Sequence, residues 1–563
     1  MGLRTPHRVT GLAFGLLVPI AGLHAQQAPD AGTLLRDQPK PPPVVAPKPA
    51  TPRIEAPAPG PAAQGPRILV KGLRITGNTL ISEAELLAHV EADVVGKEFT
   101  LDELQRVAVA LIGYYAQKGY LARVIVPPQE VRDGVVRFEV IEGRRGNLSI
   151  DRQGQRIDGD RVARFIEQRL PRGAPMDVAT LSEAISIVNE QPGARTEASL
   201  APGGGEREID VTVHAADQPF ATGSVFLNNQ GSRSTGVTQL GGGVTIANPT
   251  GNFDAASVIV NLARGSAYGR IDYGLAVGDR GLRIGANASA LEYELVQPAF
   301  AALQPEGTAQ TIGLTASYPL SRRVASNLSI VGAFDHKRLV DRSNAGETGN
   351  RTVNVGNVGL DGYTVTNTAF VLSYGVSLVA GKASQHNAAA LAADQAGRQT
   401  EGSFTKLAWN AGVLRGLDGT WTLGVTARGQ FAGKNLDSSE RFSLGGPTGV
   451  RGYPASEGTG DDGWIASVSV SRTLGERVTF APFFDVGGVT VNHSQPAVGP
   501  ANPNNYTLAA AGAAFQWRIG RQAAVNATIA IPVGSNAGAI APGLNVDGTN
   551  RAPRAWVGAS VLF

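Results

Sequence analysis

The strongest candidate for specific polar chemistry is a single arginine, Arg451, among four glycines and two prolines in the stretch 445–454. This stretch lies in a connection at 432–463 between two strongly alternating segments, and a loop of that length is usually functional or disordered. Glycine allows close backbone approach and proline fixes φ, so the loop can hold one definite shape. The arginine then needs a partner. The alternative is an ordinary exposed loop with a solvated arginine.

The sequence offers little other chemistry. It contains no cysteine, which excludes disulfides, thiolate metal sites and a cysteine nucleophile. No Ser/His/Asp or paired-carboxylate arrangement can be assigned, so we expect no catalytic residue, no metal and no cofactor. The net charge is +3 without a basic stripe, which argues against nucleic acid. A Gly-x-x-x-x-Gly-Lys-Ser/Thr loop is absent, which argues against a nucleotide.

The composition, with 71 glycines, 2 methionines and 17% charged residues, favours turn-rich β structure. Residues 1–25 are typical of a signal peptide, with Arg4 and Arg8 before an apolar run and small residues up to Ala25. No other window approaches the ~18 to 20 apolar residues that a transmembrane helix needs. If the chain enters a membrane, it must therefore do so as a closed barrel.

Two segments follow the signal peptide. Residues 26–39 contain a candidate short helix capped by Asp30, which we interpret as a plug; a disordered tail is the alternative. Residues 40–66 are rich in proline and predict a semi-rigid linker. A helix at the end of such a linker would be tethered yet mobile.

Residues 67–142 and 143–217 predict two similar α+β modules of the order βααββ. In the first module Ser82 and Glu85 have the spacing of a capping box at the start of a helix. The expected elements are 68–76, 82–91, 101–118, 121–126 and 135–141 in the first module, and 146–150, 160–170, 178–191, 196–201 and 208–214 in the second. Tandem modules without clustered His, Asp or Glu are more naturally a binding array than a catalytic domain.

Residues 218–563 read as strand after strand, with apolar and polar residues alternating. We count roughly sixteen strands, an even number that closes an up-and-down membrane barrel. They begin near residues 223, 237, 255, 268, 281, 309, 326, 352, 368, 402, 420, 463, 477, 505, 523 and 553. The five tryptophans all lie in this region, which suits interfacial belts but also a soluble core.

Connection lengths separate a membrane barrel from a soluble β-sandwich. Long connections are expected after odd-numbered strands, at 294–308, 340–351, 380–401, 432–463, 491–504 and 534–552. Those after even-numbered strands are short, as at 279–280, 321–325 and 472–476. Outer-membrane barrels have short periplasmic turns and long extracellular loops, and nothing in a sandwich requires this asymmetry. The loop that carries Arg451 is then the sixth extracellular one.

Taken together, the chain resembles the two-partner secretion transporters, the TpsB class or haemolysin secretion/activation protein family. The resemblance rests on the signal peptide, the short helix, the linker, the sixteen strands, the motif Val450-Arg451-Gly452-Tyr453, and two modules similar to polypeptide-transport-associated (POTRA) domains. It implies a barrel in the bacterial outer membrane with the N-terminal domains in the periplasm. It also implies that the sixth loop folds into the lumen, where the motif arginine meets an acidic residue on a barrel strand.

Strand parity supplies a candidate for that acidic residue. The apolar register of the thirteenth strand runs through Phe480, Phe484 and Val486, so Asp485 faces the lumen, and its surroundings resemble the family's Phe-x-Asp-x-Gly strand. The alternative is a solvated lumen carboxylate with no particular partner. Two further stretches match the family: Gly460, Asp461, Gly463 and Trp464 resemble its Gly-Asp-x-Gly-Trp motif, and the terminal Phe563 resembles the aromatic signal read by the barrel-insertion machinery.

The resemblance implies a non-enzymatic pore that exports one large adhesin- or haemolysin-like exoprotein from the periplasm to the cell surface. Its partners would be that exoprotein, outer-membrane lipid and, during biogenesis, the barrel-assembly machinery. An extended client could be captured at an exposed strand edge of the modules by β-augmentation. Two alternatives remain: a barrel-assembly factor of the same superfamily, and a passive porin-like channel, which would not need residues 67–217.

Overall fold

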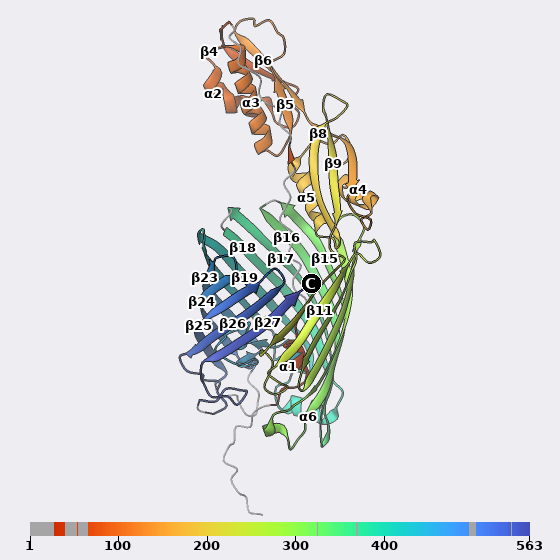
Figure 1. The fold of residues 1–563 in the computed structure, drawn as a ribbon, viewed down its shortest axis with the longest axis vertical. Helices are drawn as coiled ribbons and strands as arrows, with labels where there is room; N and C mark the ends of the chain where they lie inside the picture. The colour runs from red at the N-terminus through yellow and green to blue at the C-terminus, as the bar shows by residue number, and fades with distance from the viewer. Residues whose placement is uncertain are drawn as a thin grey trace, which may run out of the picture.

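The computed structural model describes residues 28–39, 53–54, 66–323, 325–367, 370–494, 503–541 and 543–563. Figure 1 shows two small modules in a row above one mouth of a β-barrel, with the short helix α1 (Ala31–Arg36) within the barrel. The predicted signal peptide at 1–25 lies outside the described residues. So does the predicted linker at 40–66, apart from residues 53–54 and 66.

The first module keeps the predicted order of elements. Its sheet has the order β3-β6-β5, and α2 and α3 pack against it. The elements are β2 (Ile68–Leu69), β3 (Gly72–Thr76), α2 (Glu83–Val94), β4 (Glu98–Phe99), α3 (Leu101–Gln117), β5 (Ala122–Ile125) and β6 (Val135–Glu142). The expected single strand at 68–76 is two short strands, because β2 pairs with β4 while β3 pairs with β6.

The predicted capping box at the start of α2 is only half formed. Ser82 caps the helix and accepts a hydrogen bond from the backbone N of Glu85. The Glu85 carboxylate instead accepts from the Tyr114 hydroxyl and pairs with Lys118 Nζ, 2.7 Å away in each case, because α3 lies alongside. A complete capping box stands one helix later, where Thr100 and Glu103 start α3.

The second module repeats the pattern with β7 (Arg144–Arg152), α4 (Gly159–Glu167), α5 (Val178–Asn189), β8 (Ala194–Pro202) and β9 (Glu208–Asp217). Its sheet has the order β1-β8-β9-β7, and the two helices enclose a core with the strands. The added strand β1 (Arg53–Ile54) comes from the linker and pairs in parallel with Ser199 and Leu200 of β8. The open edge of this sheet therefore accepts an extended segment.

In the described part of the chain, sixteen antiparallel strands form the closed barrel that the alternation predicts. They are β10 (Ala221–Asn228), β11 (Gln239–Ala247), β12 (Ala255–Ala263), β13 (Ser266–Val277), β14 (Leu282–Glu294), β15 (Glu306–Arg323), β16 (Ser326–Ser343), β17 (Gly346–Asn367), β18 (Phe370–Gln385), β19 (Gly402–Asp418), β20 (Trp421–Ala432), β23 (Asp462–Leu474), β24 (Val478–Thr490), β25 (Asn505–Ile519), β26 (Ala523–Val533) and β27 (Arg554–Leu562). Closure pairs the first strand, β10, with the last, β27.

The connections lie mostly where they were expected. Short elements within them are η1 (Pro298–Phe300), α6 (Ala388–Ala396), η2 (Ser438–Glu440), β21 (Phe442–Ser443) and β22 (Thr459–Gly460). Helix α6 lies at the end of the barrel opposite the modules (Figure 1). The expected loop at 340–351 is wrong: β16 and β17 stay paired as far as Ser343 and Gly346. Its charged residues suggested a loop, but Asp341 and Arg351 are buried and pair with each other.

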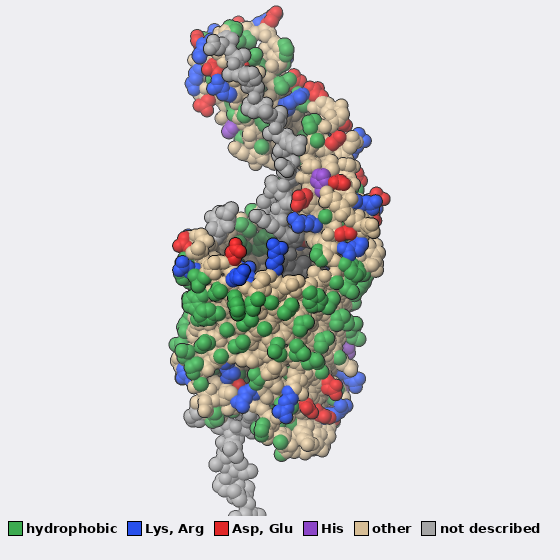
Figure 2. Space-filling model, viewed as in Figure 1, with side chains coloured by type: hydrophobic (Ala, Val, Ile, Leu, Met, Phe, Trp, Pro, Cys, Tyr) green, Lys and Arg blue, Asp and Glu red, His purple; other side chains and the backbone are tan. Residues whose placement is uncertain are grey.

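The outer wall of the barrel is apolar. Figure 2 shows a broad band of hydrophobic side chains around the wall on the visible face, with charged side chains concentrated near its two rims. Outward residues such as Ile271, Ile312 and Phe484 are 58, 66 and 44% exposed. Such a band between two charged rims matches the lipid-facing surface of an outer-membrane barrel. None of the helices in the described ranges is long and apolar enough to cross a membrane.

The second module is fixed to the barrel by an aromatic anchor. Phe253, from the turn between β11 and β12, is fully buried in the core of this module. Its ring lies 5.9 Å from that of Phe165, edge to face, and 5.2 Å beneath the Arg161 guanidinium. Arg161 also donates from Nη2 to the carbonyl of Ala276 in β13, at 2.8 Å. The module and the barrel thus share one packed interface.

Candidate functional site

The connection 433–461, called here the lumen loop, is held against the inside of the barrel wall. Its residues Leu444, Val450 and Tyr453 are fully buried. They form one apolar cluster with wall residues Ile465, Val489, Leu508 and Ala510. A loop of this length with its own apolar core keeps a fixed shape, as the glycine and proline content of 445–454 predicts.

The structure brings Arg451 and Asp485 together. Asp485, on β24, is 0% exposed, whereas its neighbour Phe484 points outward, as strand parity predicts. Arg451 donates to this carboxylate from its backbone N at 3.1 Å, from Nε at 2.8 Å and from Nη2 at 2.6 Å. Ser467 donates a further hydrogen bond to Asp485 Oδ1 at 2.7 Å. The pair has the two-pronged geometry that makes arginine–carboxylate contacts directional.

The surroundings of Arg451 restrict it further. The guanidinium carbon lies 3.2 Å from the centroid of the Phe483 ring, and Trp556 Nε1 donates to the Arg451 carbonyl at 2.9 Å. The next residue must be small: a Cβ on Gly452 would lie 2.8 Å from Ala510 Cβ and 3.1 Å from the backbone N of Pro532. The motif 450–453 therefore fits β24, β25, β26 and β27 at once.

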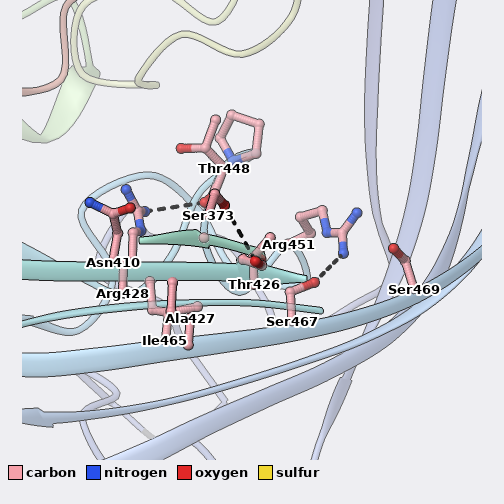
Figure 3. Close-up of a pocket in the computed structure, with 14 residues that line it drawn as sticks. Ser373, Asn410, Thr426, Ala427, Arg428, Thr448, Arg451, Ile465, Ser467 and Ser469 are labelled. Carbon is pink, nitrogen blue, oxygen red and sulfur yellow. Dashed lines mark hydrogen bonds between the residues drawn. The ribbon is translucent and has the colours of Figure 1, made fainter. Parts of the chain in front are cut away.

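A cavity of about 460 Å³, with both polar and apolar lining residues, lies beside this contact. Its lining includes Asn410, Arg428 and Ser469 from the wall and Thr448 from the lumen loop. Figure 3 shows Arg428 donating to the Thr448 carbonyl, at 3.1 Å, and Arg451 donating to Ser467. The lumen next to the loop is thus lined by side chains that hydrogen-bond water or peptide.

The residues of the second predicted motif have separate roles. Asp461 is fully buried and joins three connections: its carboxylate contacts Arg398 Nη2 at 2.8 Å, Arg441 Nε at 3.2 Å and the backbone N of His493 at 3.1 Å. Gly460 and Gly463 leave no room for a side chain: a Cβ on Gly460 would lie 2.3 Å from the Thr490 carbonyl O, and one on Gly463 would lie 2.5 Å from the Phe442 ring. Trp464 points outward and is 41% exposed.

The predicted C-terminal residue lies at the closure of the barrel. The backbone of Phe563 exchanges two hydrogen bonds, of 2.8 and 3.0 Å, with that of Gly223 in β10. The Phe563 side chain is 58% exposed on the barrel surface. It does not contact Arg451 or Asp485, so its predicted role in insertion is separate from the lumen site.

Sequence reasoning missed further anchors of the lumen loop. Glu440 contacts Lys337 Nζ at 2.5 Å and Lys406 Nζ at 2.9 Å, and Asp437 contacts Arg351 Nε at 2.6 Å. The loop carboxylates Asp437, Glu440 and Glu457 are all nearly fully buried. The sequence does show several acidic residues in this loop and Lys or Arg residues at inward positions of the neighbouring strands. It does not show which acid pairs with which cation, because the partners lie far apart in sequence.

The short helix α1, called here the plug helix, lies in the barrel lumen. Ala31 and Leu34 are buried in an apolar cluster with wall residues that include Tyr268, Leu291 and Tyr293. Asp30 caps the helix by accepting from the Thr33 backbone N at 2.9 Å, and its other oxygen contacts Arg351 Nη2 at 2.6 Å. Burial raises the pKa of Asp30, but Arg351 and hydrogen bonds outweigh it and lower that pKa to about 2.

The described residues contain no group of three or more His, Asp or Glu side chains able to hold a metal ion. What the lumen offers instead is a set of paired charges. Each loop carboxylate in these pairs faces a cation on the wall or on another connection. Such an arrangement can hold segments in place and release them.

Two family models match the chain. The family model "Haemolysin secretion/activation protein ShlB/FhaC/HecB" matches residues 205–518, more than half of the chain. A model of the ShlB-type POTRA domain matches residues 68–143.

Similar proteins include the heme/hemopexin transporter protein HuxB of Haemophilus influenzae, 26% identical with 80% of this chain and 81% of that one covered. Another is the outer membrane transporter CdiB of Dickeya dadantii, 23% identical with 77% and 78% covered. A solved structure of CdiB from Escherichia coli shares the fold, with a TM-score of 0.69 at 20% identity over 90% of this chain and 93% of that one. The chain therefore belongs to the haemolysin secretion/activation protein family, whose members are outer-membrane β-barrel transporters of two-partner secretion.

Proposed function

We propose that the protein exports one large, adhesin- or haemolysin-like exoprotein through its barrel lumen, in extended form and without catalytic chemistry. The observation that carries the proposal is that two separate segments, the lumen loop and the plug helix, lie in the lumen and are held there by side-chain ion pairs. A passive channel does not need removable segments in its lumen. A pore that must admit a large client and stay closed between clients does need them.

In this proposal the Arg451–Asp485 pair, called here the lumen lock, keeps the lumen loop in its export-competent shape. Buried ion pairs add little net stability, because desolvation offsets their attraction. They do select one geometry, since a stranded buried charge is costly. The three donors of Arg451 to one fully buried carboxylate fit that role. Val450, Gly452 and Tyr453 support it through the apolar cluster and the close approach to the wall.

The plug helix closes the resting pore. It is six residues long and is followed by the predicted linker at 40–66, so it can leave the lumen without separating from the protein. Two faces hold it: Ala31 and Leu34 against the wall, and Asp30 against Arg351. Both contacts are small enough to be exchanged for contacts with a client.

The two periplasmic modules recruit the client. The edge of β8 pairs with the chain's own residues Arg53–Ile54, which supports capture of extended peptide by strand addition. Because Phe253 fixes the second module at the barrel mouth, a segment bound there lies near the lumen entrance. Barrel-assembly machinery is the expected partner during biogenesis, with Phe563 as the residue it reads.

Reconstitution with a client tests this function. The neighbouring reading frames are sequenced for a large exported protein, which is then expressed together with the chain as the client. Client in the medium is measured beside heat-modifiable barrel in the outer membrane. We expect secretion from the full chain and none from a variant without residues 67–217, at equal barrel levels. Secretion that survives the deletion would refute recruitment by the modules. Loss of other outer-membrane barrels on removal of the intact protein would favour the barrel-assembly alternative.

A further inference from the structure

Arg351, on β17, is a junction of three separate parts of the chain. Its side chain is 6% exposed and contacts three carboxylates through three different nitrogens: Nη2 to Asp30 at 2.6 Å, Nη1 to Asp341 at 2.7 Å and Nε to Asp437 at 2.6 Å. Asp30 belongs to the plug helix, Asp341 to the barrel wall and Asp437 to the lumen loop. One guanidinium therefore fixes both removable segments to the wall.

The two segments also touch each other around this arginine. Ser438, in the lumen loop, donates from Oγ to Asp30 at 2.7 Å and accepts from Arg351 Nη2 at 3.0 Å. Gly32 packs so closely that a Cβ there would lie 2.3 Å from Ser438 Oγ. At the other end of the helix, Ser456 of the loop donates to Asp37 at 2.7 Å. The plug helix thus rests on the loop as well as on the wall.

The wall side of the junction is rigid. Asp341 accepts from Tyr293 OH at 2.6 Å and from the backbone N of Ala31 at 2.7 Å, in addition to Arg351. The planar guanidinium cannot turn toward a new partner without giving up this contact. Its orientation is then set jointly by the wall and by whichever of the two segments is present.

We infer that Arg351 is a positioning residue that couples the plug helix to the lumen loop, so that each segment is held more firmly while the other is in place. Asp437, on the loop, holds Nε of Arg351 and so orients Nη2 toward Asp30. In the same way Asp30, on the plug helix, holds Nη2 and so orients Nε toward Asp437. Coupling between two sites is reciprocal: loosening the loop must release the plug by the same factor by which loosening the plug releases the loop. The inference rests on the proposed resting position of the plug helix.

This coupling makes opening a joint event. A client that displaces either segment lowers the hold on the other, and in the absence of a client neither leaves readily. The lumen lock is separate, because Arg451 and Asp485 do not contact Arg351 or the plug helix in the described part of the chain. Export and coupling can therefore be tested apart.

Single cysteines provide the test, since the chain has none of its own. Leu34→Cys reports on the plug helix and Leu444→Cys on the lumen loop, because both side chains are buried. Maleimide labelling rates are measured on the full chain in liposomes, without client. The perturbing variants are Asp437→Asn, on the loop side, and Asp30→Asn, on the plug side. The matched control is Asp272→Asn, a lumen-facing carboxylate paired with Arg270 instead.

We expect Asp437→Asn to speed labelling of the plug reporter, and Asp30→Asn to speed labelling of the loop reporter, by roughly 5- to 150-fold each. Asp272→Asn should change neither rate by more than about twofold. The inference is overturned if Asp437→Asn leaves the plug reporter at the wild-type rate, or if Asp272→Asn has the same effect. If Asp437→Asn does not assemble, Ser438→Ala removes the bridging hydroxyl and is judged by the same criterion. Because no client is present, failed export does not affect the outcome.

Discussion

Removing either member of the lumen lock should disable export without unfolding the barrel. Arg451→Ala leaves the fully buried Asp485 carboxylate with the backbone N–H of residue 451 and the Ser467 hydroxyl as hydrogen-bond donors but with no cation. Asp485→Ala leaves the guanidinium without its carboxylate. Stranding a buried charge costs about 3–5 kcal/mol. At about 1.4 kcal/mol per tenfold, the locked loop should become roughly a hundred- to several-thousand-fold less favoured. The strand pairing of β24 is unchanged, so barrel levels should stay normal.

The double variant makes this prediction specific. Since both residues act through one contact, Arg451→Ala with Asp485→Ala should export no worse than either single variant. Exchanging the two charges should restore only part of the activity, because the planar fork of arginine would sit on the wrong strand. Arg428→Ala is the matched control: it removes a guanidinium from the same cavity that makes one hydrogen bond to the loop, to the Thr448 carbonyl. Its effect should be about tenfold or less.

Two measurements test whether Arg451 and Asp485 act as a pair. Secreted client is quantified for the wild type, both single variants, the double variant and the control, with outer-membrane abundance in parallel. Labelling of Leu444→Cys in the same backgrounds reports directly whether the lumen loop has loosened. Additive losses in the double variant would refute the pairing, even if each residue proves important. Near-normal secretion from both single variants would show that the contact between Arg451 and Asp485 is not needed for export.

Three further perturbations follow from the same structure. Removing residues 26–39 should raise single-channel conductance in planar bilayers, and Gly32→Val should do the same, because its new side chain clashes with the lumen loop. Phe253→Ala should cost the interface of the second module about 3–5 kcal/mol, seen as faster protease cleavage between module and barrel and as reduced export. Conductance should be constant from pH 8 to 5 and rise only well below that. The pKa of Asp30, about 2 when the helix is docked, is lower than its ordinary 3.8, so its contribution is complete above 3.8 and is lost as the pH falls toward 2.

Matched variants control these tests. Gly269→Val introduces the same side chain on the wall at a position with no atom within 4 Å, so conductance should not change. Phe220→Ala removes a half-exposed aromatic ring at the same junction and should have little effect on cleavage. Unchanged conductance without residues 26–39 would show that the plug helix does not obstruct the pore. A rise in conductance already between pH 8 and 6 would show that another group holds it.

The strand count and the inward orientation of Asp485 could be predicted because both follow from a period of two. A residue's side of the wall is fixed by its neighbours in the strand, and Phe484 and Val486 decide it for Asp485. The elements of the modules could be predicted for a similar reason, since helix caps and alternation are local. A prediction from local sequence is wrong where a residue from another element competes for the same group. Glu85 does not complete the predicted capping box, because its carboxylate accepts a hydrogen bond from Tyr114 on the next helix.

The junction at Arg351 could not be predicted from the sequence. Its carboxylates come from positions 30, 341 and 437, and no periodicity connects a plug, a strand and a loop. The same charges also made the segment 340–351 resemble a solvated loop, although it is paired strand. Charged residues predict an exposed loop only when water solvates them. In this segment the charged residues pair with other side chains in the lumen.

The position of Phe253 has a consequence for biogenesis. Its ring, together with Ala276 of β13, completes the apolar core of the second module. A nascent chain in the periplasm, whose barrel strands are not yet paired, therefore cannot finish this module and exposes an unfilled apolar site beside Phe165. The core of the module is complete only when the turn between β11 and β12 has placed Phe253 against Phe165. We expect transporters whose barrel is incomplete to expose this apolar site to periplasmic proteases and chaperones.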